Sequence, residues 1–294
     1  MSSPQGTEAL DAQEPKLFSL PAPYALLIIG VVCYGFLVAV PLTSGIPDWV
    51  ATFGGSLLFA CLSMALVAAG TLWRTQPYEE MLLAAAFLVA WVLLDKLAGS
   101  HEMLRLYLGP ASNVLFLLSC LFVGKVLAHI VRERAMALPV AIVAAVADIF
   151  TVFWGPTGQA LEKAPKLVAK LSLAIPQAGS AAGPAGAKGL AHVATIGLGD
   201  FIFLALFMCL AVRFGLRVVP TFWAMLVGAC VGIAIALGNP FGLAGMPLLP
   251  YMSAGFLAVN FHEFHLTLQE RRDLMIALVI LGVLFAVVAV ALRL

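Results

Sequence analysis

The sequence predicts an all-α, polytopic membrane bundle of about nine transmembrane helices. Hydrophobic residues occupy 63% of the 294 positions and charged residues only 11%, whereas soluble domains have about 45–50% and about 25%. A soluble fold of this length cannot bury such an apolar surplus, and the mean hydropathy of +1.06 agrees. The apolar runs are continuous, without the alternation typical of a transmembrane β-barrel.

Each predicted span is close to the length of about 20 residues that a helix needs to cross a bilayer. The nine apolar segments are approximately 22–42, 51–72, 81–98, 111–131, 137–155, 193–213, 219–237, 247–267 and 273–293. Residues 1–21 are predicted to form a disordered tail, because they are polar and lack the basic start and short apolar core of a signal peptide.

One connection is long, over residues 156–192. Its first half, 161–173, mixes Leu and Val with lysines, which favours an amphipathic segment at the membrane interface. Its second half, 177–189, is rich in Gly, Ala, Ser and Pro and indicates a flexible linker.

The distribution of Lys and Arg in short loops predicts a cytoplasmic N-terminus and an external long loop. The basic residues assigned to the cytoplasmic side are Lys16, Arg74, Arg132, Arg134, Arg213, Arg217, Arg271 and Arg272. Four lysines of the long loop count against this orientation, but the balance of the short loops favours it.

Charge and cysteine usage exclude several functions. The net charge of +1 and the absence of a basic stripe argue against nucleic-acid binding. All five cysteines lie inside apolar runs without a CxxC pair, which indicates packing residues. The His262, Glu263 and His265 group lacks HExxH spacing. We therefore expect neither a metal nor an organic cofactor.

Two acidic residues lie well inside apolar segments, Asp148 and Asp200. An intramembrane carboxylate is a functional hypothesis by default, because a charge in lipid is costly. Asp148 lies seven residues before Gly155, and Asp200 lies eight residues after His192, so antiparallel spans would place both about 10–12 Å from one membrane face.

Two facing carboxylates in a low-dielectric site share one proton, which is the protonation state of an aspartyl hydrolase. The ionised carboxylate would take a proton from water while the protonated one donates to the scissile carbonyl. The same acids also fit a proton relay, so on their own they leave a proton-coupled transporter or channel open.

The residues around Asp200 read GLGDFIF, 197–203. Gly197 and Gly199 remove side chains just before the acid, which would let another backbone approach closely. GLGDFIF resembles the signature of the presenilin and signal peptide peptidase family of intramembrane aspartyl proteases. ADIFTVFWG, 147–155, resembles that family's first-aspartate segment, and Pro247-Leu248-Leu249 resembles its Pro-Ala-Leu motif.

The resemblance covers residues 137–267 and implies an aspartic endopeptidase without a cofactor. Asp148 and Asp200 are the implied catalytic pair, while Gly197, Leu198 and Gly199 and the motif Pro247, Leu248 and Leu249 are implied to position substrate. The implied substrates are transmembrane peptides, membrane proteins or signal-peptide remnants. The loop between the catalytic spans is implied to hold the substrate as an extended strand, which supplies hydrogen bonds to its unwound backbone.

The resemblance also divides the chain. Residues 22–136 would form an N-terminal four-helix region, 137–267 the catalytic core with loop 156–192, and 268–294 an additional transmembrane helix. Ala147 replaces the family's Tyr, Leu248 replaces its central Ala, and four spans rather than five precede Asp148. With the compact loops, these departures indicate a divergent prokaryotic branch in the cytoplasmic membrane. The external loop resembles the signal peptide peptidase arm.

Three alternatives stay open at this stage. A transporter using the same acids requires polar residues along a path to the opposite face. A prepilin-peptidase-like enzyme also uses GxGD, but usually has Lys soon after it, where this chain has Phe201-Ile202-Phe203. A catalytically silent binding or assembly protein is suggested by Ala147 and Leu248. The sequence leaves the oligomeric state open.

Overall fold

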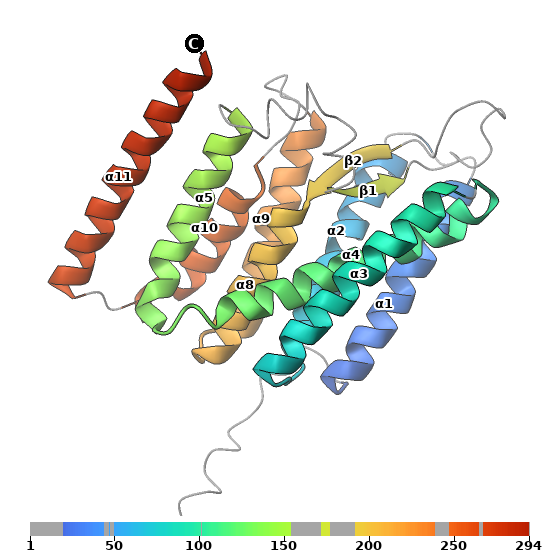
Figure 1. Cartoon of the computed structure of the whole chain (residues 1–294), viewed down its shortest axis with the longest axis horizontal. Helices are drawn as coiled ribbons and strands as arrows, with labels where there is room; N and C mark the ends of the chain where they lie inside the picture. The colour runs from blue at the N-terminus through green and yellow to red at the C-terminus, as the bar shows by residue number, and fades with distance from the viewer. Residues whose placement is uncertain are drawn as a thin grey trace, which may run out of the picture.

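The computed structural model of the chain describes residues 20–43, 47, 50–100, 102–153, 172–176, 192–238, 247–264 and 267–293. Within these ranges the chain forms nine α-helices and one two-stranded antiparallel sheet (Figure 1). Nearly all of the tail 1–21 lies outside the described residues, as do the segment 161–171 and the linker 177–189.

The N-terminal half is a group of four helices that pack on one another. They are α1 (Ala22–Ala39), α2 (Gly55–Thr71), α3 (Pro77–Ser100) and α4 (Glu102–Ala128). A π-helical turn, Val50–Gly54, leads into α2. Helices α3 and α4 are both longer than the spans predicted for them, 81–98 and 111–131. Pro110 lies inside α4.

The C-terminal half holds the remaining five helices and the sheet. They are α5 (Ala137–Phe153), β1 (Ser172–Pro176), β2 (His192–Gly197), α8 (Leu198–Arg213), α9 (Val218–Gly238), α10 (Leu249–Asn260) and α11 (Leu268–Arg293). Strand β2 pairs with β1 and continues directly into α8.

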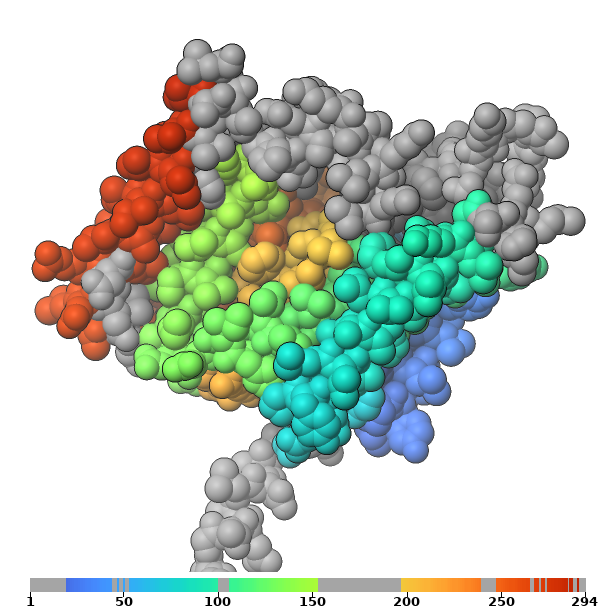
Figure 2. Space-filling view, viewed as in Figure 1, coloured from blue at the N-terminus to red at the C-terminus, as the bar shows by residue number. Residues whose placement is uncertain are grey.

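Among the described residues, five helices are long and apolar enough to cross a membrane, which agrees with a membrane protein. These stretches are Ala22–Leu42, Pro77–Gly99, Leu106–Ala128, Arg134–Val152 and Val218–Gly238. Helix α11 lies at the rim beside α5, and exposed apolar side chains run along it (Figure 2). Such a surface is unfavourable in water and suits lipid.

The sixth and eighth predicted spans are helical over a shorter range than the sequence indicated. The sixth was expected to be helical from 193, but 192–197 form β2, and the helix begins at Leu198. The eighth was expected over 247–267, but α10 has 12 residues, about 18 Å of helix. This is shorter than the hydrocarbon core of about 30 Å. In both segments the apolar run continues beyond the helix, so hydrophobicity alone did not mark the helix ends.

Close helix crossings position α8 and α10. A Cβ on Gly124 of α4 would lie 2.5 Å from the Cβ of Ala205 in α8, so only glycine permits this approach. Between α9 and α10, a Cβ on Gly228 would lie 2.5 Å from Tyr251 O, and a Cβ on Gly255 would lie 2.6 Å from Ala224 O. These glycines also permit a close backbone approach. The rings of Phe207 and Phe256 stack at 5.0 Å between α8 and α10.

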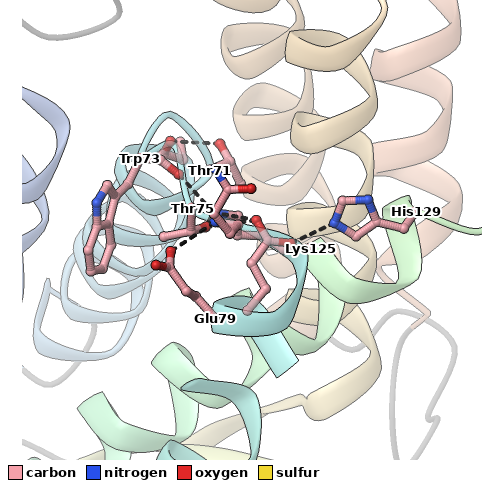
Figure 3. A network of polar contacts seen from close by, with 9 residues as sticks. Thr71, Trp73, Thr75, Glu79, Lys125 and His129 are labelled. Atoms are coloured by element: carbon pink, nitrogen blue, oxygen red, sulfur yellow. Dashed lines mark hydrogen bonds and ion pairs between the residues drawn. The ribbon is translucent and has the colours of Figure 1, made fainter. Parts of the chain in front are cut away.

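A buried polar network joins α3 and α4 to the turn between α2 and α3 (Figure 3). The Lys125 ammonium donates to Trp73 O at 2.8 Å and Thr75 Oγ1 at 2.6 Å, and pairs with Glu80 at 3.0 Å. His129 contacts the other Glu80 oxygen at 2.7 Å. Lys125 is 6% exposed, so the structure buries its charge and pairs it with Glu80.

Long-range hydrogen bonds join several turns at the end of the bundle that carries the Lys125 network. Arg213 donates to Ala128 O, and Arg134 donates to Phe214 O and pairs with Glu263. The α2–α3, α4–α5 and α8–α9 turns, which carry Arg74, Arg134 and Arg213, therefore lie at one end. The sheet and the last turn of α5 lie at the other end (Figure 1).

Candidate active site

Asp148 lies in the second half of α5, on a helix that packs against α10. Its side chain is half-buried. Asp148 Oδ2 accepts a 3.1 Å hydrogen bond from the backbone N of Leu249, the first residue of α10. A first-turn N–H has no partner inside its own helix, so the carboxylate satisfies it and is oriented by it.

Asp200 occupies the third position of α8 and is half-buried. Its Oδ2 accepts the backbone N–H of Gly197 at 3.2 Å, which closes the helix start as in a capping box. The expectation that Asp200 lies eight residues inside a helix was wrong, because β2 supplies the preceding six residues. The strand–helix junction, rather than helix depth, positions this carboxylate.

The two carboxylates are close enough to interact electrostatically. They come from α5 and α8, two helices that contact one another, and both acids lie in the halves of these helices nearer the sheet (Figure 1). The depth calculation from the sequence was wrong, because residues 192–197 form β2; a shared proton between the two acids stays a prediction. In a site of low dielectric constant, such a pair is stable when one proton is shared between its members.

The Pro247-Leu248-Leu249 segment lies at both aspartates. Pro247, Leu248 and Leu249 are buried, and the N–H of Leu249 binds Asp148. The side chain of Leu248 lines a cavity that Asp200 also lines. Leu249 thus binds one acid through its backbone, and the adjacent Leu248 shares a cavity lining with the other.

The sequence predicted that Gly197 and Gly199 let another backbone approach closely, but no backbone atom of another described segment lies within 4 Å of the Cβ position of either glycine. Gly197 has extended backbone angles, φ −70° and ψ 152°, and caps α8. A Cβ on Gly199 would find no described atom within 4 Å, so none of the described elements uses the space that this glycine leaves. Leu198 is half-buried and packs on the core. Among the described residues, Gly199 is exposed.

The cavity next to Asp200 has a volume of about 20 Å³ and is lined by α2, α8, α9 and α10. Its lining residues are Ala60, Met64, Asp200, Phe201, Leu204, Ala229, Ile233, Leu248 and Met252. Sequence reasoning missed the contribution of α2, because Ala60 and Met64 belong to an ordinary apolar run without a chemical signal.

Apolar packing separates the aspartates from the polar network around Lys125. Along α8, Leu204, Phe207 and Met208 are fully buried between the two ends. The residues that the structure describes contain no cluster of His, Cys, Asp or Glu suited to a metal ion. His265, part of the group considered in the sequence, lies outside the described residues.

The described residues place two carboxyl groups, each held by a backbone N–H, near the end of a strand. Paired carboxyl groups are of the kind that can activate water and polarise a carbonyl. In comparisons with known proteins, no family model, curated protein or solved structure matches the chain.

Proposed function

We propose that the chain is an intramembrane aspartyl protease of the GxGD type, which hydrolyses peptide bonds of transmembrane segments or signal-peptide remnants. The observations that carry the proposal are that Asp148 on α5 and Asp200 on α8 are near enough for their charges to interact, and that Leu249 of the buried Pro247-Leu248-Leu249 segment binds Asp148. Sequence motifs separated by many residues meet in one place, and together they supply the groups that such a reaction needs.

In the proposed reaction, Asp148 and Asp200 hold one proton between them. The ionised carboxylate removes a proton from a water molecule as its oxygen attacks the scissile carbonyl carbon. The protonated carboxyl donates to the carbonyl oxygen and stabilises the tetrahedral intermediate. Its collapse breaks the C–N bond, and a carboxyl returns a proton to the leaving amine, so no covalent enzyme adduct forms.

The proposed substrate lies in an extended conformation, because a helix encloses its own peptide bonds. Unwound backbone in lipid needs hydrogen-bond partners, and the β1–β2 sheet ends at Gly197, three residues before Asp200. Strand addition to this sheet would supply those partners. None of the described residues occupies the space at Gly199, where a substrate backbone would lie beside the acid.

The proposal includes nine membrane crossings, with the shorter α2, α8 and α10 lying within the bundle. The turns that carry Arg74, Arg134 and Arg213 would face the cytoplasm with the N-terminus, and the sheet would face outward. We place the protein in a prokaryotic cytoplasmic membrane, where substrates with a cytoplasmic N-terminus would match this orientation.

The buried apolar packing of α8 supports hydrolysis over ion transport. A proton path from Asp200 to the opposite end would need polar groups or water between them. The intervening α8 residues Leu204, Phe207 and Met208 are instead fully buried hydrocarbon and thioether side chains. A proton path along this part of α8 would therefore require a rearranged bundle.

The test is cleavage of a model transmembrane peptide by purified protein in liposomes, with products identified by mass spectrometry. Asp148→Asn and Asp200→Asn are the informative variants, because an amide oxygen still accepts the N–H of Leu249 or Gly197 but cannot share the proton. We expect each to abolish cleavage and a transition-state mimic to block it.

Asp95→Asn is the matched control, because it neutralises an acid of α3 outside the site. We expect it to cleave at the wild-type rate. Persistent cleavage in either site variant would refute the shared-proton mechanism. The absence of cleavage by the wild-type protein across a varied peptide panel would refute the protease itself.

A further inference from the structure

We infer that the cavity beside Asp200 is a size-limited subsite for one small apolar side chain of the substrate, adjacent to the scissile bond. The inference rests on the proposed function and names the substrate class within it. Four helices meet around this cavity, and Asp200 and Leu248 connect it to the candidate active site.

The chemistry of the lining favours an apolar occupant over water. Asp200 is the only ionisable residue among the described lining residues, and one of its oxygens already accepts the Gly197 N–H. An ordered water in a cavity usually needs two to four polar partners. The remaining lining side chains are hydrocarbon or thioether, so a water would lose hydrogen bonds there while a methyl group would lose none.

The volume limits the size of that occupant. About 20 Å³ corresponds to little more than one water-sized group. A methyl group, as in alanine, fits this space, whereas the side chains of leucine and phenylalanine exceed it. Ala60 and Ala229 create the space by being small, and both are almost completely buried in the packed core.

Met64 and Leu248 are the two longer side chains that limit the cavity beside Asp200. Met64 enters from α2 and is 3% exposed, so its flexible thioether side chain occupies room that a shorter residue would release. Leu248 lies just before α10, and a Cβ on Gly232 of α9 would lie only 2.7 Å from Leu248 Cδ2. The absence of a side chain at Gly232 therefore lets Leu248 reach the cavity.

The inference predicts opposite effects for substitutions that enlarge or fill the cavity. Met64→Ala enlarges it and should admit larger substrate side chains. Ala229→Leu fills it and should favour glycine over alanine. Met81→Ala and Ala86→Leu make the same chemical changes on exposed positions of α3 and serve as matched controls.

The experiment first maps the cleaved bond in a model transmembrane peptide, and then varies the residue on each side of it among Gly, Ala, Leu and Phe. The readout is the ratio of kcat/KM between peptides for one protein preparation, which does not depend on the fraction of folded enzyme. At one of the two positions, we expect the wild type to cleave Ala at least about tenfold faster than Leu or Phe.

Met64→Ala should reduce this Ala-to-Leu ratio by about tenfold, and Ala229→Leu should lower the Ala-to-Gly ratio, while both controls keep the wild-type ratios. Cleavage that ignores side-chain size at both positions, or ratios that Met64→Ala leaves unchanged, would overturn the subsite and leave the protease standing. Failure of the wild type to cleave any peptide would overturn both.

Discussion

The backbone N–H of Leu249 donates a 3.1 Å hydrogen bond to Asp148 Oδ2 across a sequence separation of 101 residues. This bond ties the first turn of α10 to the middle of α5, and it places the Pro247-Leu248-Leu249 segment against one of the two acids. The other acid, Asp200, is held by Gly197 at the start of α8. The site is thus built from two helix starts, whose free N–H groups each orient a carboxylate.

Replacing Asp148 should separate the structural role of this carboxylate from its chemistry. Asp148→Leu leaves the Leu249 N–H without its partner, and we expect a loss of about 1–3 kcal/mol in the free energy of unfolding. Asp148→Asn keeps an acceptor and should stay close to wild type. Equilibrium unfolding in detergent measures both, and equal stability of the two variants would contradict this role.

The crossing of α4 and α8 should depend on Gly124. A Cβ at this position would lie 2.5 Å from Ala205 Cβ and 2.6 Å from Ile202 O, so Gly124→Ala should destabilise the protein by about 1–3 kcal/mol. Gly99→Ala in α3 meets nothing within 4 Å and should be neutral or slightly stabilising. Thermal unfolding of the pair checks the prediction, which fails if both variants unfold alike.

Removing only one member of the buried Lys125–Glu80 ion pair should lower the free energy of unfolding strongly. Lys125→Met leaves the buried Glu80 carboxylate without its main countercharge, and we expect a loss of about 3–5 kcal/mol. The double variant Lys125→Met/Glu80→Gln removes both charges and should recover much of that loss. A double-mutant cycle measures the coupling; additive effects would contradict it.

Lys96→Met is the control for this cycle, because Lys96 is an exposed cation on α3. Its replacement should change the free energy of unfolding by less than about 1 kcal/mol. A loss as large as that of Lys125→Met would mean that removal of any lysine, rather than of a buried partner, destabilises the protein.

The apolar barrier along α8 predicts no proton conduction. Liposomes containing the wild-type protein should show the same proton flux as liposomes containing Asp200→Asn, measured with an internal pH dye under an imposed gradient. A flux that depends on Asp200 would favour the transporter interpretation and would contradict the packing argument built on Leu204, Phe207 and Met208.

Sequence reasoning located the two acids and the proline motif because each carries a chemical signal within a few residues. An aspartate in an apolar run is costly and therefore conspicuous. It failed at His192–Gly197, where an apolar segment of β-branched residues forms a strand that hydropathy alone does not distinguish from a helix start. It also missed Ala60 and Met64, whose role comes only from the helices that they face.

By itself, the sequence determined that the chain is a bundle of apolar helices, because its hydrocarbon surface exceeds what a soluble fold can bury. The tertiary structure alone decided that Leu249 binds Asp148 and that α2 closes the cavity beside Asp200. The physical reason is that apolar runs are interchangeable in lipid. Their pairing is decided by side-chain fit and by single polar contacts between segments far apart in the chain.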